Sequence, residues 1–432
     1  MRRVKLLPDA ARTDRQGGRA RWLVGDTVHM LSEHVWAHVF LFFNWMLALA
    51  WLRHATAALR GMPKLPDLLR TEGAVLTALA SNDGPNVTVI VPACNEEATI
   101  QATLRSLLAS TGLQLEIVAV DDRSSDRTGA RMDAVAAEAQ AAGGPHRLEV
   151  IHNRELPEGW LGKPHAMNLA LKRATAPWLL LTDGDVVFHP HALELSVRYA
   201  EAHRADHLVL MLTLILNTTG ERAMLAAMNA LANWNIRLWK VADPKAKDSF
   251  AAGGFNLVRR DVFERLGGFE ALRMQVVEDL CLAWKVKHAG YAQHVVLGPG
   301  LARIRWLEGP LGVVKLTEKN GFAIFRYRTW LALLSCVGLT VNVVFPLAAL
   351  ATGGWAAMAG ALTYAAIVLA YYASRRVTQV SPWLAVFFAP AVAVILFAFL
   401  RSILLTVVRG GVKWRGTLYP LAELRRNAQS GW

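Results

Sequence analysis

The feature that most constrains this chain is a stretch of 46 consecutive residues, 329–374, without an Asp, Glu, Lys or Arg. Gly353 and Gly354 divide it into two apolar runs of about 20 residues, each long enough to cross the hydrocarbon core of a bilayer. A third uncharged run, 377–400, follows and contains two prolines. We therefore predict three hydrophobic membrane segments over residues 330–408.

A shorter apolar run, residues 34–52, lies near the N-terminus and reads HVWAHVFLFFNWMLALAWL. It lies too far along the chain for a signal peptide and lacks a cleavage pattern of small residues. We predict a membrane anchor or an interfacial helix at 34–52. It lies between a basic N-terminal segment at 1–33 and a linker at 53–84.

The net charge of +13 suits contact with the anionic head groups of a lipid bilayer. Nucleic acid is the competing partner, but the sequence shows no basic and aromatic binding module, so we expect a membrane and no nucleic acid. The three cysteines are far apart and form no metal-binding spacing, which is typical of a reducing compartment.

Between the two apolar regions, the chain shows short β-rich runs that alternate with helix-forming segments. The β-rich runs are residues 87–93, 115–122, 147–153, 178–185 and 207–216. Strands at this spacing, with helices between them, are typical of a mostly parallel sheet flanked by helices on both faces. We therefore predict an α/β domain at residues 85–325.

Polar clusters follow three of these predicted strands. The first strand ends in PACNEE, the second in DDRSSD and the fourth in DGD. In a parallel sheet, ligands bind where the carboxyl ends of the strands meet. We therefore expect the three acidic clusters to form one site at this edge of the sheet.

Asp183 and Asp185 flank one glycine after an apolar strand, where two carboxylates can share a hard divalent cation such as Mg²⁺ or Mn²⁺. Such a cation keeps water ligands and bridges to substrate phosphates. Asp-Gly-Asp is also good turn chemistry. The two other acidic clusters favour the metal site over a plain turn.

The chain has neither a G-x-x-x-x-G-K-[ST] loop nor a G-x-G-x-x-G sequence after a strand, so acidic loops and a metal would have to hold a nucleotide. Asp121 and Asp122 could accept hydrogen bonds from a base or a ribose, and Glu96 from ribose hydroxyls. Lys163 offers a cation to a diphosphate. The alternative for Lys163 is a solvated lysine in a loop rich in Gly and Pro.

Two further segments carry candidate residues. Gly253 and Gly254 would let the backbone approach a bound sugar, although a tight turn explains them as well. Glu278 and Asp279 lie at the start of a predicted helix, where the helix dipole favours carboxylates. A carboxylate that faces the metal site could instead act as general base on an acceptor hydroxyl. Spacing alone does not separate these interpretations.

Six segments between residues 85 and 300 read VIVPACNEEATI, VAVDDRSSDRT, GKPHAMNLAL, LLLTDGDVVFHP, AAGGFNLVRRDVFERLGGF and VEDLCLAWKVKHAG. In this order they resemble the motifs of family 2 glycosyltransferases. The resemblance implies the GT-A fold. It also implies transfer of a sugar from a nucleoside diphosphate, with inversion at the anomeric carbon.

The resemblance also implies roles for single residues. Asp183 and Asp185 match the metal-binding D-x-D sequence of the family. Asp279 matches the position of the catalytic base, with Glu278 beside it. Some residues expected to bind the donor match the family's nucleotide loops, and the others are the candidates named above. Together they are Pro92, Ala93, Glu96, Asp121, Asp122, Lys163, Asp183, Gly253 and Gly254.

The processive polysaccharide synthases of this family carry a Q-x-x-R-W sequence before their membrane helices, and this chain has no such sequence. Arg326 and Arg328 could serve the diphosphate, but a role as interfacial positive charges explains them better. Within the basic tail at 409–432, the sequence KWRGTLYPLAELRR resembles that of non-processive members associated with hopanoids, ceramides and carotenoids. We therefore expect a nucleoside-diphosphate sugar as donor, a lipid or polyprenyl-type acceptor, and an interfacial tail.

A cytosolic donor requires the catalytic domain to face the cytoplasm, so we expect a multi-pass protein of the cell inner (plasma) membrane. One alternative is a polysaccharide synthase, and another is a nucleotide-binding membrane scaffold. Intact Asp183, Asp185 and Asp279 argue against an inactive binding domain. The apolar runs contain no carboxylate, which argues against a transporter.

Overall fold

The computed structural model describes residues 14–70 and 85–430, with side chains from residue 35 onward to residue 428. The predicted basic segment at 1–33 and the predicted linker at 53–84 therefore lie partly outside the described residues. The chain divides into two compact units. They are Met1–Arg53 with Asn342–Ala366, and His54–Val341 with Ile367–Trp432.

The first unit contains parts of three long helices, α1 (Asp14–Gly61), α10 (Thr329–Thr352) and α11 (Gly354–Thr378). Within it, Nε1 of Trp51 donates a hydrogen bond of 2.8 Å to Oδ1 of Asn342. Gly360 allows close packing of α11 on α10, because a Cβ at this position would lie 2.7 Å from the carbonyl oxygen of Pro346. Small residues serve this purpose where apolar helices meet.

Four helical segments among the described residues are long and apolar enough to cross a membrane. They are Val35–Lys64, Thr329–Thr352, Gly354–Thr378 and Pro382–Val408. This confirms the prediction of one apolar membrane segment near the N-terminus and three toward the C-terminus. The first helix runs past the predicted end at Leu52 to Gly61, because RHATAALR consists mostly of good helix formers.

A seven-stranded sheet lies at the centre of the second unit, in the order β3-β2-β1-β4-β8-β6-β9. Its strands are β1 (Val87–Ala93), β2 (Leu115–Asp122), β3 (Arg147–Asn153), β4 (Trp178–Leu181), β6 (His207–Leu210), β8 (Asn256–Arg259) and β9 (Gln293–Val296). Strand β8 is antiparallel to both β4 and β6, whereas all other neighbours are parallel. The predicted mostly parallel sheet is confirmed.

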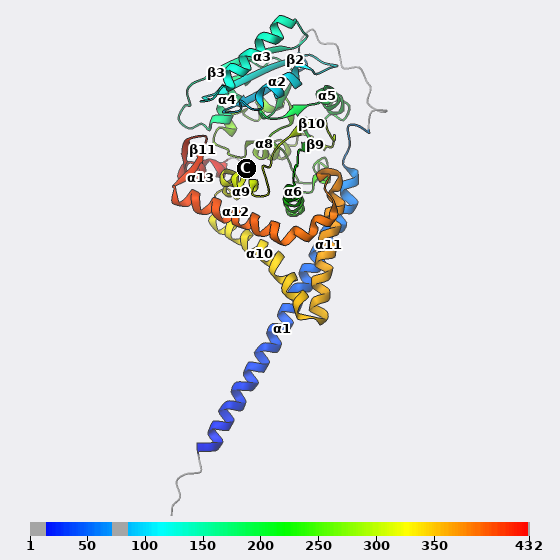
Figure 1. The fold of residues 1–432 in the computed structure, drawn as a ribbon, viewed down its shortest axis with the longest axis vertical. Helices are drawn as coiled ribbons and strands as arrows, with labels where there is room; N and C mark the ends of the chain where they lie inside the picture. Colours follow the sequence, from blue (N-terminus) through cyan, green and yellow to red (C-terminus); the bar gives the residue numbers. More distant parts are fainter. Residues whose placement is uncertain (1–13, 71–84, 431–432) are drawn as a thin grey trace, which may run out of the picture. The chain divides into compact units, whose positions relative to one another are not determined.

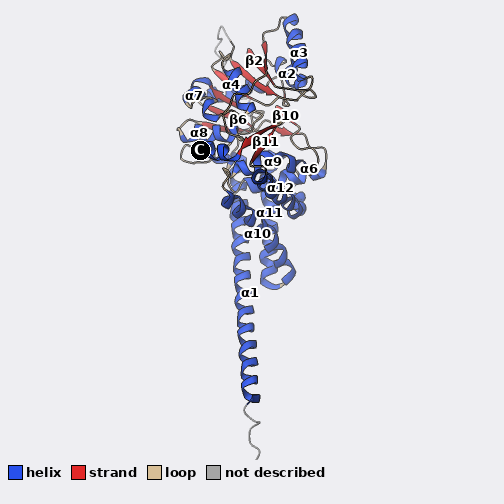
Figure 2. Ribbon diagram, turned by 90° about the vertical axis from the view of Figure 1, so that its left-hand side faces the viewer, coloured by secondary structure: helices blue, strands red, loops and turns tan. Residues whose placement is uncertain are grey.

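Helices enclose this sheet (Figure 2). Val89 of β1 packs into one apolar core and Ile90 into another, because successive strand side chains point to opposite faces. The first core includes α2 (Ile100–Leu108), α3 (Thr128–Ala142) and α5 (Ala192–Ala202); the second includes α4 (Gly162–Leu171), α7 (Arg260–Arg265) and α8 (Glu278–His288). Burial on both faces explains the nearly continuous apolar run of β1.

Two strands are shorter than predicted. Strand β4 ends at Leu181, where the chain turns into the Asp-Gly-Asp loop. The predicted strand at 207–216 is divided, and its second part forms β7 (Thr213–Leu214) in a separate sheet with β5 (Val187–Phe188) and β10 (Ala302–Ile304). The β-rich composition of 207–216 predicted extended backbone but did not specify which sheet each part would join.

Helix α9 (Gly312–Ile324) packs along α12 (Phe388–Val408) in the second unit (Figure 1). Glu318 of α9 forms ion pairs with Arg401 at 2.6 Å and with Arg409 at 2.7 Å. Helix α6 (Thr219–Ala232) also contacts α12. Short helical turns occur at Met62–Lys64, Leu238–Lys240, Glu270–Leu272 and Pro382–Phe387.

The predicted interfacial tail at 409–432 has a defined structure in its described part. It forms a hairpin of β11 (Gly411–Trp414) and β12 (Thr417–Pro420), followed by helix α13 (Leu421–Ser430). Val412, Tyr419 and Leu424 are buried in one core with Leu161, which directly precedes α4. The apolar residues of the tail therefore pack against the α/β part of the chain.

Candidate active site

The acidic clusters lie at one edge of the sheet. Strands β2, β1 and β4 are parallel neighbours, so their carboxyl ends lie side by side. Ala93 at the end of β1 pairs with Asp121 at the end of β2. Strand β8 begins at the same edge, because Asn256 pairs with Leu181 in antiparallel orientation. The structure thus brings the predicted clusters together and adds the loop that precedes β8.

Lys163, near the start of α4, links two of the acidic segments. Its Nζ lies 2.7 Å from Oδ1 of Asp183 and 2.6 Å from Oε1 of Glu278. Burial disfavours the charged lysine, but these carboxylates outweigh burial and raise the pKa of Lys163 well above its usual range. Lys163 is therefore part of a buried ion cluster and not a solvated loop residue.

The loop that carries the two aspartates is fixed by close packing. Oγ1 of Thr182 donates a hydrogen bond of 2.7 Å to the carbonyl oxygen of Gly254. A Cβ at Gly184 would lie 3.1 Å from the Cβ of Ala93, so glycine lets the loop lie against the end of β1. These contacts fix the backbone of the loop that carries the two carboxylates.

The carboxylates of this site repel one another. Burial, followed by the charges of Asp183 and Glu96, raises the pKa of Asp185 to about 7. Burial, followed by the charge of Glu278, raises the pKa of Asp279 to about 7. We call the five carboxylates of Glu96, Asp183, Asp185, Glu278 and Asp279 the acidic edge. Such crowding of negative charge favours the binding of a cation.

Asp183 and Asp185 fit a divalent cation. Burial alone would raise the pKa of Asp183, but the ion pair with Lys163 lowers it, so this carboxylate stays ionised. No group of three or more His, Cys, Asp or Glu residues in the described part of the chain could hold a metal alone. Two carboxylates suit a hard cation that completes its coordination with water and a bound phosphate.

Gly253 and Gly254, the two glycines predicted to let the backbone approach a bound sugar, have different surroundings. A Cβ at Gly253 would lie 2.9 Å from Oδ2 of Asp183 and 3.5 Å from Nζ of Lys163, so Gly253 faces the acidic edge. A Cβ at Gly254 would lie 2.6 Å from Cδ1 of Leu212. Packing against an apolar side chain therefore explains Gly254, and only Gly253 borders the candidate site.

Asp121 and Asp122, the predicted base-contacting pair, are buried at the end of β2. Both oxygens of Asp122 accept hydrogen bonds from Arg123, and Oδ1 accepts another from Asn153 at 2.8 Å. Oδ2 of Asp121 lies 3.2 Å from Nδ1 of His152, whereas its Oδ1 is buried without a hydrogen-bond partner among the described residues. An unpaired buried acceptor is costly, so Oδ1 of Asp121 is the atom that a ligand could satisfy.

The two acids at the start of α8 also differ. Glu278 is buried and held by Lys163. Asp279 is half-buried, and its only hydrogen bond within the described residues comes from the backbone N–H of Leu280 at 2.8 Å. Of these two acids at the start of α8, Asp279 is therefore the one whose carboxylate forms no ion pair within the described residues.

Two cations that the sequence analysis missed also reach the acidic edge. Arg415, in the turn between β11 and β12, has its Nη2 3.4 Å from Oε1 of Glu96. Nζ of Lys319, in α9, lies 4.0 Å from the ring centre of Trp414. Their charges add to that of Lys163 in lowering the pKa of Asp183. We call α9, β11, β12 and α13 the C-terminal cover.

The sequence contains a signal for Arg415. Arg415-Gly416 separates GVKW from TLYP, and two residues between short β-rich runs are typical of a hairpin turn. Arg326 and Arg328, which the sequence suggested for a diphosphate, lie instead between α9 and α10. Neither is among the cations that lower the pKa of Asp183.

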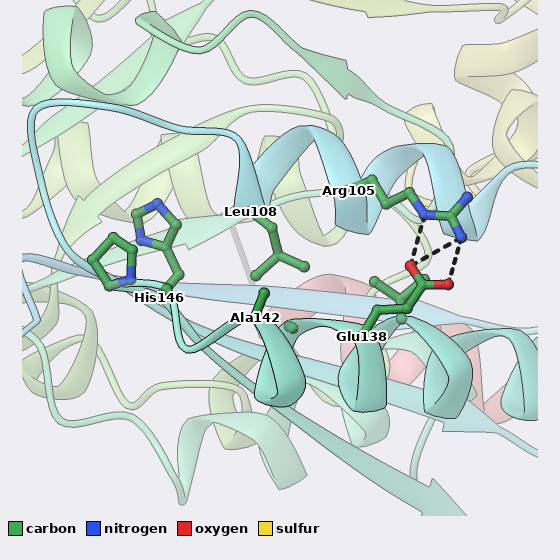
Figure 3. Close-up of a pocket in the computed structure, with 9 residues that line it drawn as sticks. Arg105, Leu108, Glu138, Ala142 and His146 are labelled. Carbon is green, nitrogen blue, oxygen red and sulfur yellow. Dashed lines mark hydrogen bonds and ion pairs between the residues drawn. The ribbon is translucent and has the colours of Figure 1, made fainter.

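A separate hollow lies between α2 and α3 (Figure 3). Arg105 of α2 points toward Glu138 of α3, with 2.9 Å between Nη2 and Oε1. His146 lines the other end and is engaged by the backbone of Ser110 and Leu115. An exposed ion pair and a structural histidine provide no catalytic arrangement, so the acidic edge is the candidate site.

Residues 88–267 match the family described as Glycosyl transferase family 2. The chain is 26% identical over 213 residues to EpsE of Bacillus subtilis (strain 168), which carries a provisional glycosyltransferase name; the match covers 49% of this chain and 69% of EpsE. It is 31% identical over 123 residues to the succinoglycan biosynthesis protein ExoO of Rhizobium meliloti (strain 1021). That match covers 28% of this chain and about a third, 32%, of ExoO.

Among solved structures, the chain is similar to the mannosyltransferase PcManGT from Pyrobaculum calidifontis, in complex with GDP-Man and Mn²⁺. The TM-score is 0.51 at 20% sequence identity, and the match covers 84% of this chain and 99% of PcManGT. A likeness at this level of identity concerns the fold. It confirms the predicted α/β architecture of the GT-A type.

Proposed function

Because the chain carries a family 2 glycosyltransferase domain at residues 88–267, we propose that it transfers a sugar from a nucleoside diphosphate to a lipid or polyprenyl-type acceptor in the membrane. Transfer proceeds with inversion at the anomeric carbon. The catalytic domain faces the cytoplasm, where the donor is found, at the inner (plasma) membrane. An acceptor in the bilayer gives a sugar-transferring domain a reason to be joined to four apolar helices.

The observation that carries this proposal is the Lys163 bridge between Asp183 and Glu278. It joins the D-x-D loop to the start of α8 at a single ammonium group. A donor bound at the loop would therefore present its sugar to the acids of α8. The two halves of the reaction, release of the diphosphate and activation of the acceptor, then share one site.

Asp183 and Asp185 hold a divalent cation, Mg²⁺ or Mn²⁺, in this proposal. When bound, the cation stabilises the negative charge that develops on the leaving diphosphate. PcManGT, which shares the fold, is in complex with Mn²⁺ and GDP-Man. Lys163 keeps Asp183 ionised and ready for the cation.

The nucleoside lies along the ends of β1 and β2. Oδ1 of Asp121 accepts a hydrogen bond from the base, since it is the buried acceptor without a partner among the described residues. Asp122 orients Arg123 through paired hydrogen bonds. Glu96, after Pro92 and Ala93, reaches toward the ribose.

Asp279 acts as general base. It takes the proton of the acceptor hydroxyl while that oxygen attacks the anomeric carbon on the side opposite the diphosphate. Burial raises its pKa to about 7, close to a physiological pH, which is where a general base is most effective. Glu278 holds Lys163, and Gly253 leaves space for the sugar beside Asp183.

Incubation of membranes that contain the full chain with labelled nucleotide sugars, followed by extraction into organic solvent, tests the proposal. We expect the label in the organic phase when Mg²⁺ or Mn²⁺ is present, and not with Asp183→Ala. The name of ExoO, a succinoglycan biosynthesis protein, favours a polysaccharide synthase as the second candidate. Label in a water-soluble polymer would support that candidate, and label in neither fraction would support a nucleotide-binding scaffold.

A further inference from the structure

We infer that Arg415 and Lys319 of the C-terminal cover bind the diphosphate of the sugar donor. The inference rests on the proposed function and identifies the basic residues that complete the donor site. These residues lie outside the matched family segment at 88–267, Lys319 in α9 and Arg415 in the turn between β11 and β12.

The backbone of Arg415 is the first observation. Arg415 and Gly416 both have positive φ angles, of 48° and 84°, in the two-residue turn of the hairpin. Such turns favour Asn, Asp or Gly at the first position, because other residues adopt positive φ at a cost in energy. A positive φ at an arginine points to a function only together with the contacts of its side chain.

The partner of Arg415 is the second observation. Its Nη2 lies 3.4 Å from Oε1 of Glu96, and each of the two side chains is 29% exposed. A long ion pair between partly exposed groups contributes little stability. Arg415 can therefore exchange Glu96 for a phosphate, to which a guanidinium donates two parallel hydrogen bonds. Glu96 lies in the loop that follows β1, at the proposed donor site.

Lys319 supplies the third observation. Its ammonium group lies over the face of Trp414 and has no hydrogen bond or ion pair within the described residues. Lys163 differs, because two carboxylates match its charge. Burial and then the charges of Lys163 and Arg415 lower the pKa of Lys319 to about 8. A half-buried cation that forms no ion pair among the described residues is a ready partner for a diphosphate oxygen.

The hairpin that carries Arg415 is firmly attached at the site. The hydroxyl of Tyr419 accepts a hydrogen bond of 3.3 Å from the backbone N–H of Gly162, which directly precedes Lys163. Val412 and Tyr419 are buried in the same core as Leu161. The turn therefore holds Arg415 over the loop after β1, next to the helix that supplies Lys163.

Binding of nucleotides to the purified full chain in detergent with Mn²⁺ tests the inference, with GDP, GMP, UDP and UMP as probes. Arg415→Asn removes the charge but suits the positive φ of the turn. Lys319→Met removes the charge and keeps an apolar chain over Trp414. The control, Lys413→Asn, removes an exposed charge from the same hairpin.

We expect Arg415→Asn and Lys319→Met each to weaken binding of the diphosphate by about 10- to 100-fold, the effect of one charge-assisted hydrogen bond. Monophosphate binding should change less than about two-fold, and Lys413→Asn should change neither. Unchanged diphosphate affinity in both variants would overturn the inference, and so would equal losses for monophosphate and diphosphate. If the native chain bound neither GDP and UDP nor the diphosphates of adenosine, cytidine and thymidine, the proposed function itself would fail.

Discussion

The acidic edge and the C-terminal cover approach the same site with contacts of different kinds. Lys163 binds its two carboxylates at 2.6 and 2.7 Å, and its charge is fully matched. On the other side, Arg415 lies 3.4 Å from Glu96, and Lys319 contacts a tryptophan ring and no carboxylate within the described residues. One side is an assembled ion cluster, and the other presents cations with little opposing charge.

This difference suggests a division of work. Groups that are held in place before the substrate arrives lose little energy to reorganisation, which suits Asp183 as a metal ligand and Glu278 as the partner that holds Lys163. Cations with weak partners can turn to an incoming anion at small cost. We therefore expect damage to the acidic edge to stop the chemistry, and damage to the cover to weaken donor binding.

The largest effect is expected for Asp183→Ala. This change removes a proposed metal ligand and one of the two partners of Lys163. Loss of several kcal/mol of charge stabilisation corresponds to a fall of roughly 10⁴-fold in turnover. Sugar transfer to lipid by purified protein measures it. Asp261→Ala, on the exposed face of α7, is the control; retained activity in Asp183→Ala would exclude the metal role.

Asp279→Asn should have the next largest effect. It keeps the size of the side chain and removes its basicity, so turnover should fall on the order of 10³-fold. Affinity for the nucleoside diphosphate should stay within about three-fold, because Asp279 does not belong to the donor loops. Single-turnover kinetics and nucleotide binding separate the two quantities. Lost nucleotide binding with normal turnover of bound donor would make Asp279 a donor ligand and leave Glu278 as the base.

The pH dependence of kcat/KM should identify the same group. Burial raises the pKa of Asp279 to about 7, so the carboxyl is protonated below this pH and cannot accept a proton. We expect kcat/KM to fall about ten-fold per pH unit below pH 7 and to be level above it. The measurement uses saturating Mn²⁺. A fall of the same shape in Asp279→Asn would assign this titration to another group.

The smallest effect is expected at the attachment of the cover. Tyr419→Phe leaves the buried N–H of Gly162 without its acceptor, at a cost of about 1 kcal/mol. Hydrogen exchange in residues 411–420 should become about five-fold faster, and exchange in β1 and β2 should not change. Equal acceleration in the sheet would mean that the cover and the acidic edge unfold together.

The sequence predicted the acidic edge because strand ends are local features. The run WLLLTDGD shows both the strand and the carboxylates at its end, and parallel pairing with β1 then brings this end beside the loop of Glu96. The antiparallel β8 was not predicted, because its four residues carry no signal for direction. Because β8 runs antiparallel to β4, the loop before β8 lies at the end of β4, and Gly253 lies beside Asp183.

The cover could not be predicted in this way. Arg415 meets Glu96 across 319 positions of the chain, and Tyr419 meets Gly162 across 257. Such contacts depend on how α9, α12 and the hairpin pack, which no local pattern specifies. The basic composition of 409–432 suggested a lipid surface, whereas its few buried apolar residues decide where the tail packs.

The mass of the lipid product shows whether this protein transfers a sugar to a lipid. Purified full-length protein in lipid nanodiscs is given a nucleotide sugar and Mn²⁺, and the extracted lipids are analysed by mass spectrometry, with Asp183→Ala as the matched control. We expect a lipid heavier by a single sugar residue, formed by the native protein and absent from the control. Free sugar released by hydrolysis, or a long water-soluble polymer without any glycosylated lipid, would contradict it.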